Sequence, residues 1–69
     1  MDIKKSFGKR VSELRKKLGY SQESFWSKCK LHRTYIGMIE RGEKNVSLEN
    51  IQKIAESLNI SIEFLFKGL

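Results

Sequence analysis

Arg33 and Thr34 stand side by side in a basic, polar part of the chain, and both side chains suit contacts with nucleic-acid bases. An arginine can pair with O6 and N7 of guanine, and a threonine can hydrogen-bond a base or touch the methyl group of thymine. Met38 follows about one helical turn after Thr34. Its side chain can touch only apolar base surface, and packing in the core is an equal alternative. For Arg33 and Thr34 the alternative is an exposed, solvated pair, or with Thr34 as a weak helix cap.

The other reactive side chains do not form a catalytic or metal-binding set. One cysteine and one histidine are too few for a four-ligand zinc site or an intramolecular disulfide. The sequence has no glycine-rich phosphate loop and no nucleophile–base set, so we expect neither an enzyme nor a cofactor. Cys29 falls on an apolar helix face, where we expect a small buried hydrophobic residue; a redox switch is the minor alternative.

The charge of the 69 residues is high and unevenly distributed. Fourteen lysines and arginines against eight acidic residues give a net charge of +6. Residues 1–45 hold 12 basic and 5 acidic residues, a net charge of +7, whereas residues 46–69 carry a net charge of −1. An anionic polymer or membrane surface is therefore the first partner to consider. The apolar runs are too short for a membrane span, no secretory signal is evident, and a lone cysteine fits a reducing compartment.

The hydrophobic pattern is helical throughout and supports no strand. A stripe at spacings of 4, 4, 3 and 4 predicts a first helix over residues 3–18, and its members are Ile3, Phe7, Val11, Leu14 and Leu18. Ser21 can cap a second helix, a third begins at Arg33 and ends before Gly42, Ser47 can cap a fourth, and Ser61 can open a short fifth. The expected core consists of Phe7, Leu14, Phe25, Leu31, Ile36, Ile39, Ile51, Ile54 and Leu58.

The second and third helices are each about eight residues long and are joined by about three, with a polar, basic start to the third. That outline is typical of a helix-turn-helix, in which the first short helix braces the second across the major groove of DNA. We therefore expect one all-α domain over residues 1–69.

The residues that carry a family resemblance are Ser21-Gln22-Glu23, Leu31, Ile36, Ile39 and Glu40-Arg41-Gly42, flanked by Leu14–Gly19 and Ser47–Leu58. This pattern resembles the Cro/repressor-type (xenobiotic-response-element) helix-turn-helix family, which implies a five-helix, lambda-repressor-like DNA-binding domain. Within the family, Leu31–Ile36, Ile39–Gly42 and Asn45–Leu48 are similar to restriction–modification controller proteins. The resemblance implies a transcriptional regulator in the cytoplasm of a bacterium or a phage host, associated with the nucleoid. Phage-type repressors and antitoxins share much of the same pattern.

The resemblance also assigns roles to individual positions. It implies base contacts from Arg33, Thr34 and Met38, and a structural ion pair between Arg15 and Glu40. It implies contacts with the DNA backbone from Gln22, His32, Tyr35, Arg41, Lys44, Asn45 and Arg10. Tyr35 is also within reach of bases at the dyad, and His32 has a surface or capping role as its alternative.

Two positions depart from the family pattern. Trp26 stands where a small residue is usual, at the crossing of the two short helices, so the indole must widen the crossing or swing outward. Lys30 stands where the turn usually has glycine, and a left-handed conformation costs lysine about 1 kcal/mol or more.

The C-terminal residues are too apolar for one short helix to bury. Residues 59–69 are therefore expected to form a homodimer interface, with Ile60, Ile62, Phe64, Leu65 and Phe66 as its members. A two-fold dimer would place two recognition helices about 34 Å apart and would bind double-stranded DNA as a palindromic operator. RNA polymerase is a candidate further partner.

Two other function classes compete with this interpretation. An antitoxin-type or phage-type repressor module would use the apolar tail to bind a second protein. Membrane-surface binding through the first helix is the third class, but its apolar stripe is better explained by the core, so we expect no membrane partner.

Overall fold

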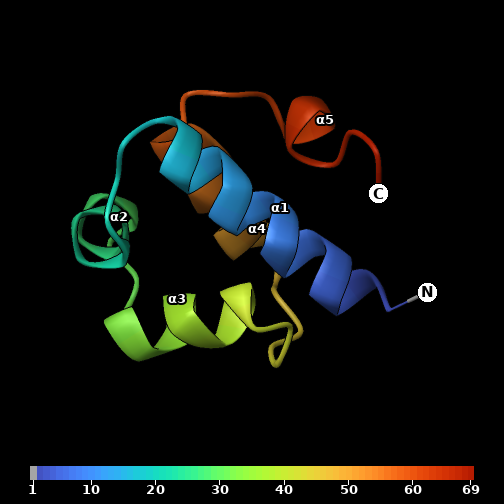
Figure 1. Cartoon of the computed structure of the whole chain (residues 1–69), viewed down its shortest axis with the longest axis horizontal. Helices are drawn as coiled ribbons and strands as arrows, with labels where there is room; N and C mark the ends of the chain where they lie inside the picture. Colours follow the sequence, from blue (N-terminus) through green and yellow to red (C-terminus); the bar gives the residue numbers. More distant parts are fainter. Residues whose placement is uncertain (1) are drawn as a thin grey trace.

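The computed structural model describes residues 2–69, and these residues form five helices and no strand (Figure 1). The helices are α1 (Ile3–Lys17), α2 (Gln22–Cys29), α3 (Arg33–Glu40), α4 (Leu48–Ser57) and α5 (Ile62–Leu65). The all-α, five-helix prediction is confirmed. The first helix ends one residue earlier than expected because Leu18 is its C-cap and Gly19 follows with φ +83°. No helix in residues 2–69 is long and apolar enough to cross a membrane.

Short polar side chains fix where the helices begin. The hydroxyl oxygens of Ser21, Ser47 and Ser61 each accept a hydrogen bond from the backbone N–H three residues later. At Ser21 the cap is reciprocal, because Ser24 Oγ accepts from the Ser21 N–H at 3.0 Å. The predicted starts of α2, α4 and α5 therefore follow from serine capping.

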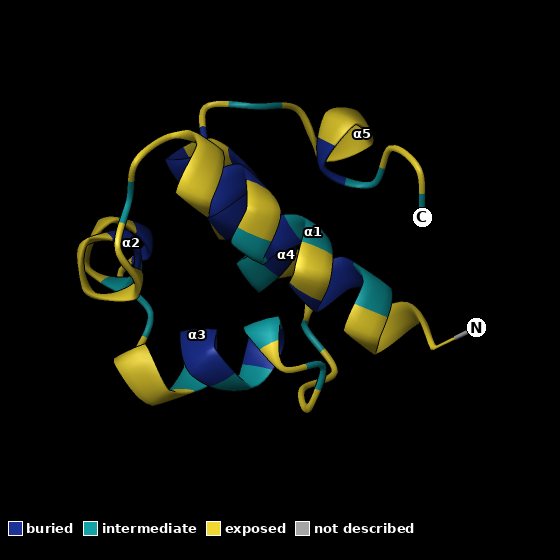
Figure 2. Cartoon of the chain, in the orientation of Figure 1, coloured by how far each residue is buried: buried dark blue, intermediate teal, exposed yellow. Residues whose placement is uncertain are grey.

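Most of the expected core residues are buried. Phe7, Leu14, Phe25, Ile36, Ile39, Ile51, Ile54 and Leu58 form one cluster, which also contains Val11, Cys29, Ala55 and Leu65 (Figure 2). Leu31 was expected in the core but is only half-buried, because it lies in the turn between α2 and α3 and packs against the edge of the cluster. Burial raises the pKa of the Cys29 thiol, which favours the neutral form expected of a core cysteine.

The backbones of α1 and α3 approach each other very closely at Gly8. A Cβ atom at Gly8 would meet the carbonyl oxygen of Ile39 and lie 2.9 Å from that of Glu40. Only glycine leaves room for this contact. Gly8 therefore sets how closely α3 packs against the long helix.

The two departures from the family pattern are accommodated locally. Lys30 takes the left-handed conformation at φ +59° as the C-cap of α2, so the turn keeps its geometry without glycine. Trp26 is half-buried and packs against the edge of the core. Its Nε1 is buried and has no hydrogen-bond partner among the described residues. The indole therefore swings to the edge of the core and leaves one donor unsatisfied.

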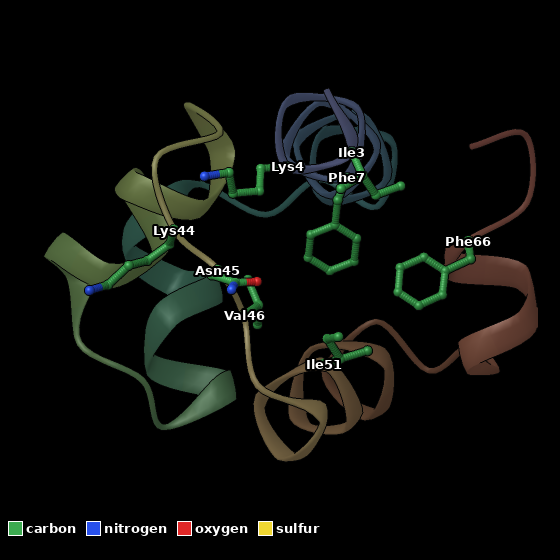
Figure 3. A pocket seen from close by; sticks show the side chains of 8 residues that line it. All are labelled: Ile3, Lys4, Phe7, Lys44, Asn45, Val46, Ile51 and Phe66. Atoms are coloured by element: carbon green, nitrogen blue, oxygen red, sulfur yellow. The ribbon is translucent and has the colours of Figure 1, made fainter. Parts of the chain in front are cut away.

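A partly open cavity of about 100 Å³ separates α5 from the start of α1 and the loop before α4 (Figure 3). Its walls are Ile3, Lys4, Phe7, Lys44, Asn45, Val46, Ile51 and Phe66. The rings of Phe7 and Phe66 lie 5.3 Å apart at one side of it. Phe66, the C-cap of α5, thus lines the same cavity as the loop that follows α3.

Candidate nucleic-acid interface

The first turn of α3 presents two side chains to solvent. Arg33 and Thr34 are exposed, and neither side chain hydrogen-bonds another described residue. His32 is the N-cap of this helix, since its Nδ1 accepts a hydrogen bond from the Thr34 N–H at 3.1 Å. His32 therefore caps α3 and holds Arg33 and Thr34 in the first helical turn, while its contact with the DNA backbone stays a prediction.

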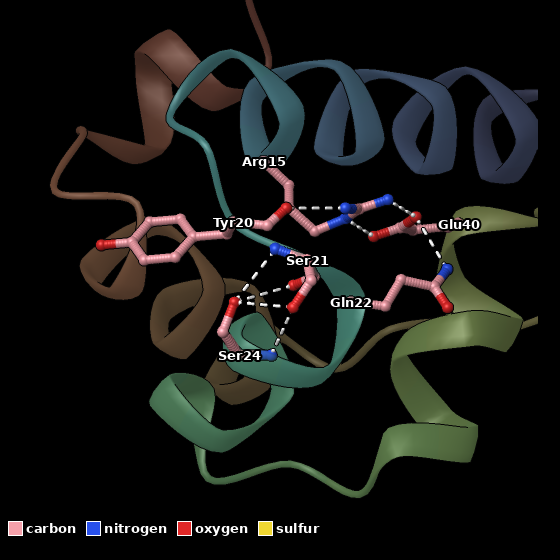
Figure 4. Close-up of polar contacts among 6 residues, drawn as sticks. All are labelled: Arg15, Tyr20, Ser21, Gln22, Ser24 and Glu40. Atoms are coloured by element: carbon pink, nitrogen blue, oxygen red, sulfur yellow. Dashed lines mark hydrogen bonds and ion pairs between the residues drawn. The ribbon is translucent and has the colours of Figure 1, made fainter.

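A buried ion pair locks α3 to the rest of the domain (Figure 4). Arg15 Nε donates to Glu40 Oε2 at 2.7 Å, and Arg15 Nη2 donates to Glu40 Oε1 at 3.0 Å. The two side chains are only 8% and 6% exposed. Arg15 Nη1 also donates to the carbonyl of Tyr20 at 2.8 Å. This bidentate geometry is the strong form of an arginine–carboxylate contact, and the predicted structural pair is confirmed.

Glu40 extends the same network to α2. Gln22, the first residue of α2, donates from Nε2 to Glu40 Oε1 at 3.1 Å. One carboxylate therefore joins α1, α2 and α3. Gln22 remains exposed at the N-terminal end of α2, where the helix dipole favours an anion.

The far end of α3 and the following loop carry a second polar group of residues. Asn50 Nδ2 donates to the hydroxyl of Tyr35 at 3.0 Å, and Lys44 Nζ lies 5.9 Å from the centre of the Tyr35 ring. Arg41 pairs with Glu43 at 3.0 Å, with side chains 58% and 51% exposed, and this contact raises the pKa of Arg41. A phosphate binding Arg41 would have to compete with Glu43.

The remaining predicted residues near α3 differ in exposure. Lys44 and Asn45 are exposed in the loop, whereas Met38 and Tyr35 are half-buried. Met38 therefore presents only part of its surface for an apolar contact. Asn50, which the sequence analysis did not select, joins this group through Tyr35; its place at the third position of α4 gave no signal that it would reach α3.

Arg10, for which a contact with the DNA backbone was predicted, binds the C-terminal segment in this structure, and the DNA contact stays a prediction. Its Nη2 donates to the carbonyl of Phe64 at 2.7 Å, its Nε donates to that of Leu65 at 3.3 Å, and its guanidinium lies 4.9 Å from the centre of the Phe64 ring. The guanidinium binds two consecutive carbonyl groups at the C-terminal end of α5. Arg10 thus ties α5 to α1.

The five residues that were predicted to form the dimer interface differ in how far they are exposed. Ile62 and Phe64 are 43% and 42% exposed, and Ile60 and Phe66 are half-buried. Leu65 is wholly buried within its own chain, so its assignment to the interface is wrong: it points inward from the single turn of α5 to fill the core. An exposed apolar face nevertheless remains on α5.

Residues 11–65 match the helix-turn-helix family, and the chain belongs to this family of DNA-binding transcriptional regulators. The chain is 46% identical to control protein C.MunI of a Mycoplasma species over 69 residues, which cover 99% of this chain and 93% of that protein. It superposes on the crystal structure of the restriction–modification controller protein C.AhdI from Aeromonas hydrophila with a TM-score of 0.92 and 44% identity, covering 96% and 100% of the two chains. Within the family it therefore resembles restriction–modification controller proteins.

The biofilm-formation regulator SinR, solved in complex with DNA, has the same fold. Its TM-score against this chain is 0.83 with 29% identity, and the match covers 88% of this chain and 98% of that one.

Proposed function

We propose that this chain binds an inverted-repeat DNA operator as a homodimer and thereby regulates transcription, as its resemblance to controller proteins suggests. The observation that carries the proposal is the first turn of α3, where the side chains of Arg33 and Thr34 are exposed and make no hydrogen bond within residues 2–69. The buried Arg15–Glu40 pair holds the helix behind them. A rigid helix with two unoccupied polar side chains at its N-terminal end suits reading of base edges in the major groove.

In this proposal the polar residues divide into two roles. Arg33 and Thr34 read bases, with Met38 adding an apolar contact. The backbone contacts come from Gln22 at the N-terminus of α2, from the residues around α3 and from the loop after it: His32, Tyr35, Arg41, Lys44 and Asn45. Contacts of the second kind fix register and orientation without reading sequence.

The exposed apolar face of α5 is the proposed dimer interface, formed by Ile62 and Phe64 with the edges of Ile60 and Phe66. Residues 59–69 then belong to the same domain as the helix-turn-helix and pair two copies of it. The protein would act in the cytoplasm on nucleoid DNA, and a contact with RNA polymerase would decide whether it activates.

Selection of bound duplexes from a random pool tests the proposal. We expect an imperfect inverted repeat with half-sites about one DNA turn apart, bound more weakly as salt rises because lysines and arginines displace counterions. No enrichment of any sequence would contradict the proposal. An antitoxin-type or phage-type module that binds a second protein would instead co-purify with a stoichiometric partner.

A further inference from the structure

The hydrogen bond between Tyr35 and Asn50 links the recognition helix to α4. Tyr35 lies in the first turn of α3 and Asn50 in the first turn of α4, and both residues are half-buried. Asn50 Nδ2 is the donor and the phenolic oxygen of Tyr35 is the acceptor, at 3.0 Å. Because the hydroxyl accepts in this bond, its own proton is left for a second hydrogen bond.

In the N-terminal cap of α4, Asn50 uses its backbone N–H, so its side chain is available to bond Tyr35. The Asn50 N–H donates to Ser47 Oγ at 3.2 Å, so Asn50 occupies the third position of the helix. A glutamate there would reach back to the N-cap backbone. The shorter asparagine side chain crosses to Tyr35 instead.

A phenolic hydroxyl can donate one hydrogen bond while it accepts another. Its proton stays near the ring plane, because an oxygen lone pair conjugates with the ring, and this leaves two positions for the proton. The Asn50 amide occupies one side of the oxygen, so the proton must point to the other side. Lys44 Nζ, 5.9 Å from the ring centre, makes the surroundings favourable to an anionic acceptor.

We propose that Asn50 is a positioning residue for DNA binding: by donating to the Tyr35 hydroxyl, it directs the phenolic proton outward as a hydrogen-bond donor to an acceptor on the DNA. This inference rests on the proposed function. Asn50 itself need not touch DNA. The amide can also turn over and accept the phenolic proton through Oδ1, and that reversed bond would withdraw the donor from the DNA.

Asn50→Asp imposes the reversed bond, because a carboxylate only accepts. An acidic residue in the first turn of a helix is favourable, so the variant is expected to fold. The experiment measures the affinity of the wild type, Asn50→Asp, Tyr35→Phe and the double variant for the duplex that the wild type selects, with thermal unfolding of each protein alongside. Gln52→Glu is the matched control, since it adds the same charge at an exposed position of α4.

We expect Asn50→Asp and Tyr35→Phe each to weaken binding about tenfold, the loss expected for one hydrogen bond to an ionised or strongly polar acceptor. Gln52→Glu should weaken it only about twofold. When Tyr35→Phe is already present, adding Asn50→Asp should cost no more than Gln52→Glu does, because the hydroxyl that Asn50 directs is gone.

A purely structural role gives a different result. If the bond served only to hold α4 against α3, the carboxylate introduced by Asn50→Asp would still make it, and that variant would bind DNA like Gln52→Glu; this result overturns the inference. A wild type that selects no duplex overturns the proposed function as well, so the two failures are distinguishable.

Discussion

The side chains of Arg33 and Thr34 are exposed and make no hydrogen bond within residues 2–69, unlike the side chain of Tyr35 on the same helix. Arg33→Ala should therefore leave stability nearly unchanged but weaken binding to the selected duplex by about 1–3 kcal/mol and relax specificity at one base pair. Fluorescence anisotropy on the selected duplex and a scrambled one measures both effects, with exposed Lys53→Ala on α4 as the control. An unchanged ratio of the two affinities would rule out base reading by Arg33.

The two ion pairs within residues 2–69 are expected to contribute very different amounts to stability. Breaking the buried pair with Glu40→Gln leaves Arg15 without a charged partner and should lower the free energy of unfolding by about 3–5 kcal/mol. Breaking the exposed Arg41–Glu43 pair with Glu43→Gln should leave it nearly unchanged, because water screens the attraction between exposed charges. Urea unfolding followed by circular dichroism compares them, and similar losses would contradict the structural role of Glu40.

Some residue roles follow from sequence and others depend on where distant segments meet. The Arg15–Glu40 pair was predicted through the family resemblance. Arg10 was not, because its partners are carbonyl groups on α5, 54 and 55 residues away, and nothing in its own neighbourhood indicates them. Asn50 escaped notice for the same reason, since its partner Tyr35 lies on another helix.

The bounds of the helices were more predictable from sequence than these residue roles, because hydrophobic stripes and serine caps are local signals. What local patterns could not give is how closely the elements pack, and Gly8 is the example. The need for glycine at this position becomes clear only in the folded structure, where the carbonyl oxygen of Ile39 on α3 lies against Gly8 on α1. The same limit applies to Trp26, whose position at the edge of the core depends on the packing around it.

Gly8→Ala tests this packing by the sign of its effect. In an unhindered helix the substitution would stabilise by about 0.8–1 kcal/mol, because alanine has the higher helix propensity. Here the added methyl group meets backbone carbonyls of α3, so we expect a net loss of stability and weaker binding to DNA. Thermal unfolding and anisotropy measure the two effects, with Lys9→Ala on the exposed side of α1 as the control. A gain in stability would show that α3 can move away without penalty.

At the scale of the whole molecule, the proposed pairing of two copies predicts a role for the apolar face of α5. Ile62→Glu places a charge where a partner would bury it, so the mass in solution should fall from about twice 8.1 kDa to that of one chain. Light scattering after size exclusion measures this mass. Leu18→Glu, at a 51% exposed apolar residue at the end of α1, should leave the pairing intact. A dimer that survives Ile62→Glu would place the interface elsewhere.

The long helix α1 stands between the two functional ends of the domain. Gly8 and Arg15 join it to α3, whereas Arg10 and Phe7 join it to the C-terminal segment, and α3 and α5 lie on opposite sides of it in Figure 1. In the proposed dimer the thickness and tilt of α1 thus contribute to the separation of the two half-sites. An operator with a different centre-to-centre distance would accordingly involve changes along α1, while a different base sequence would involve changes on α3 at Arg33, Thr34 and Met38.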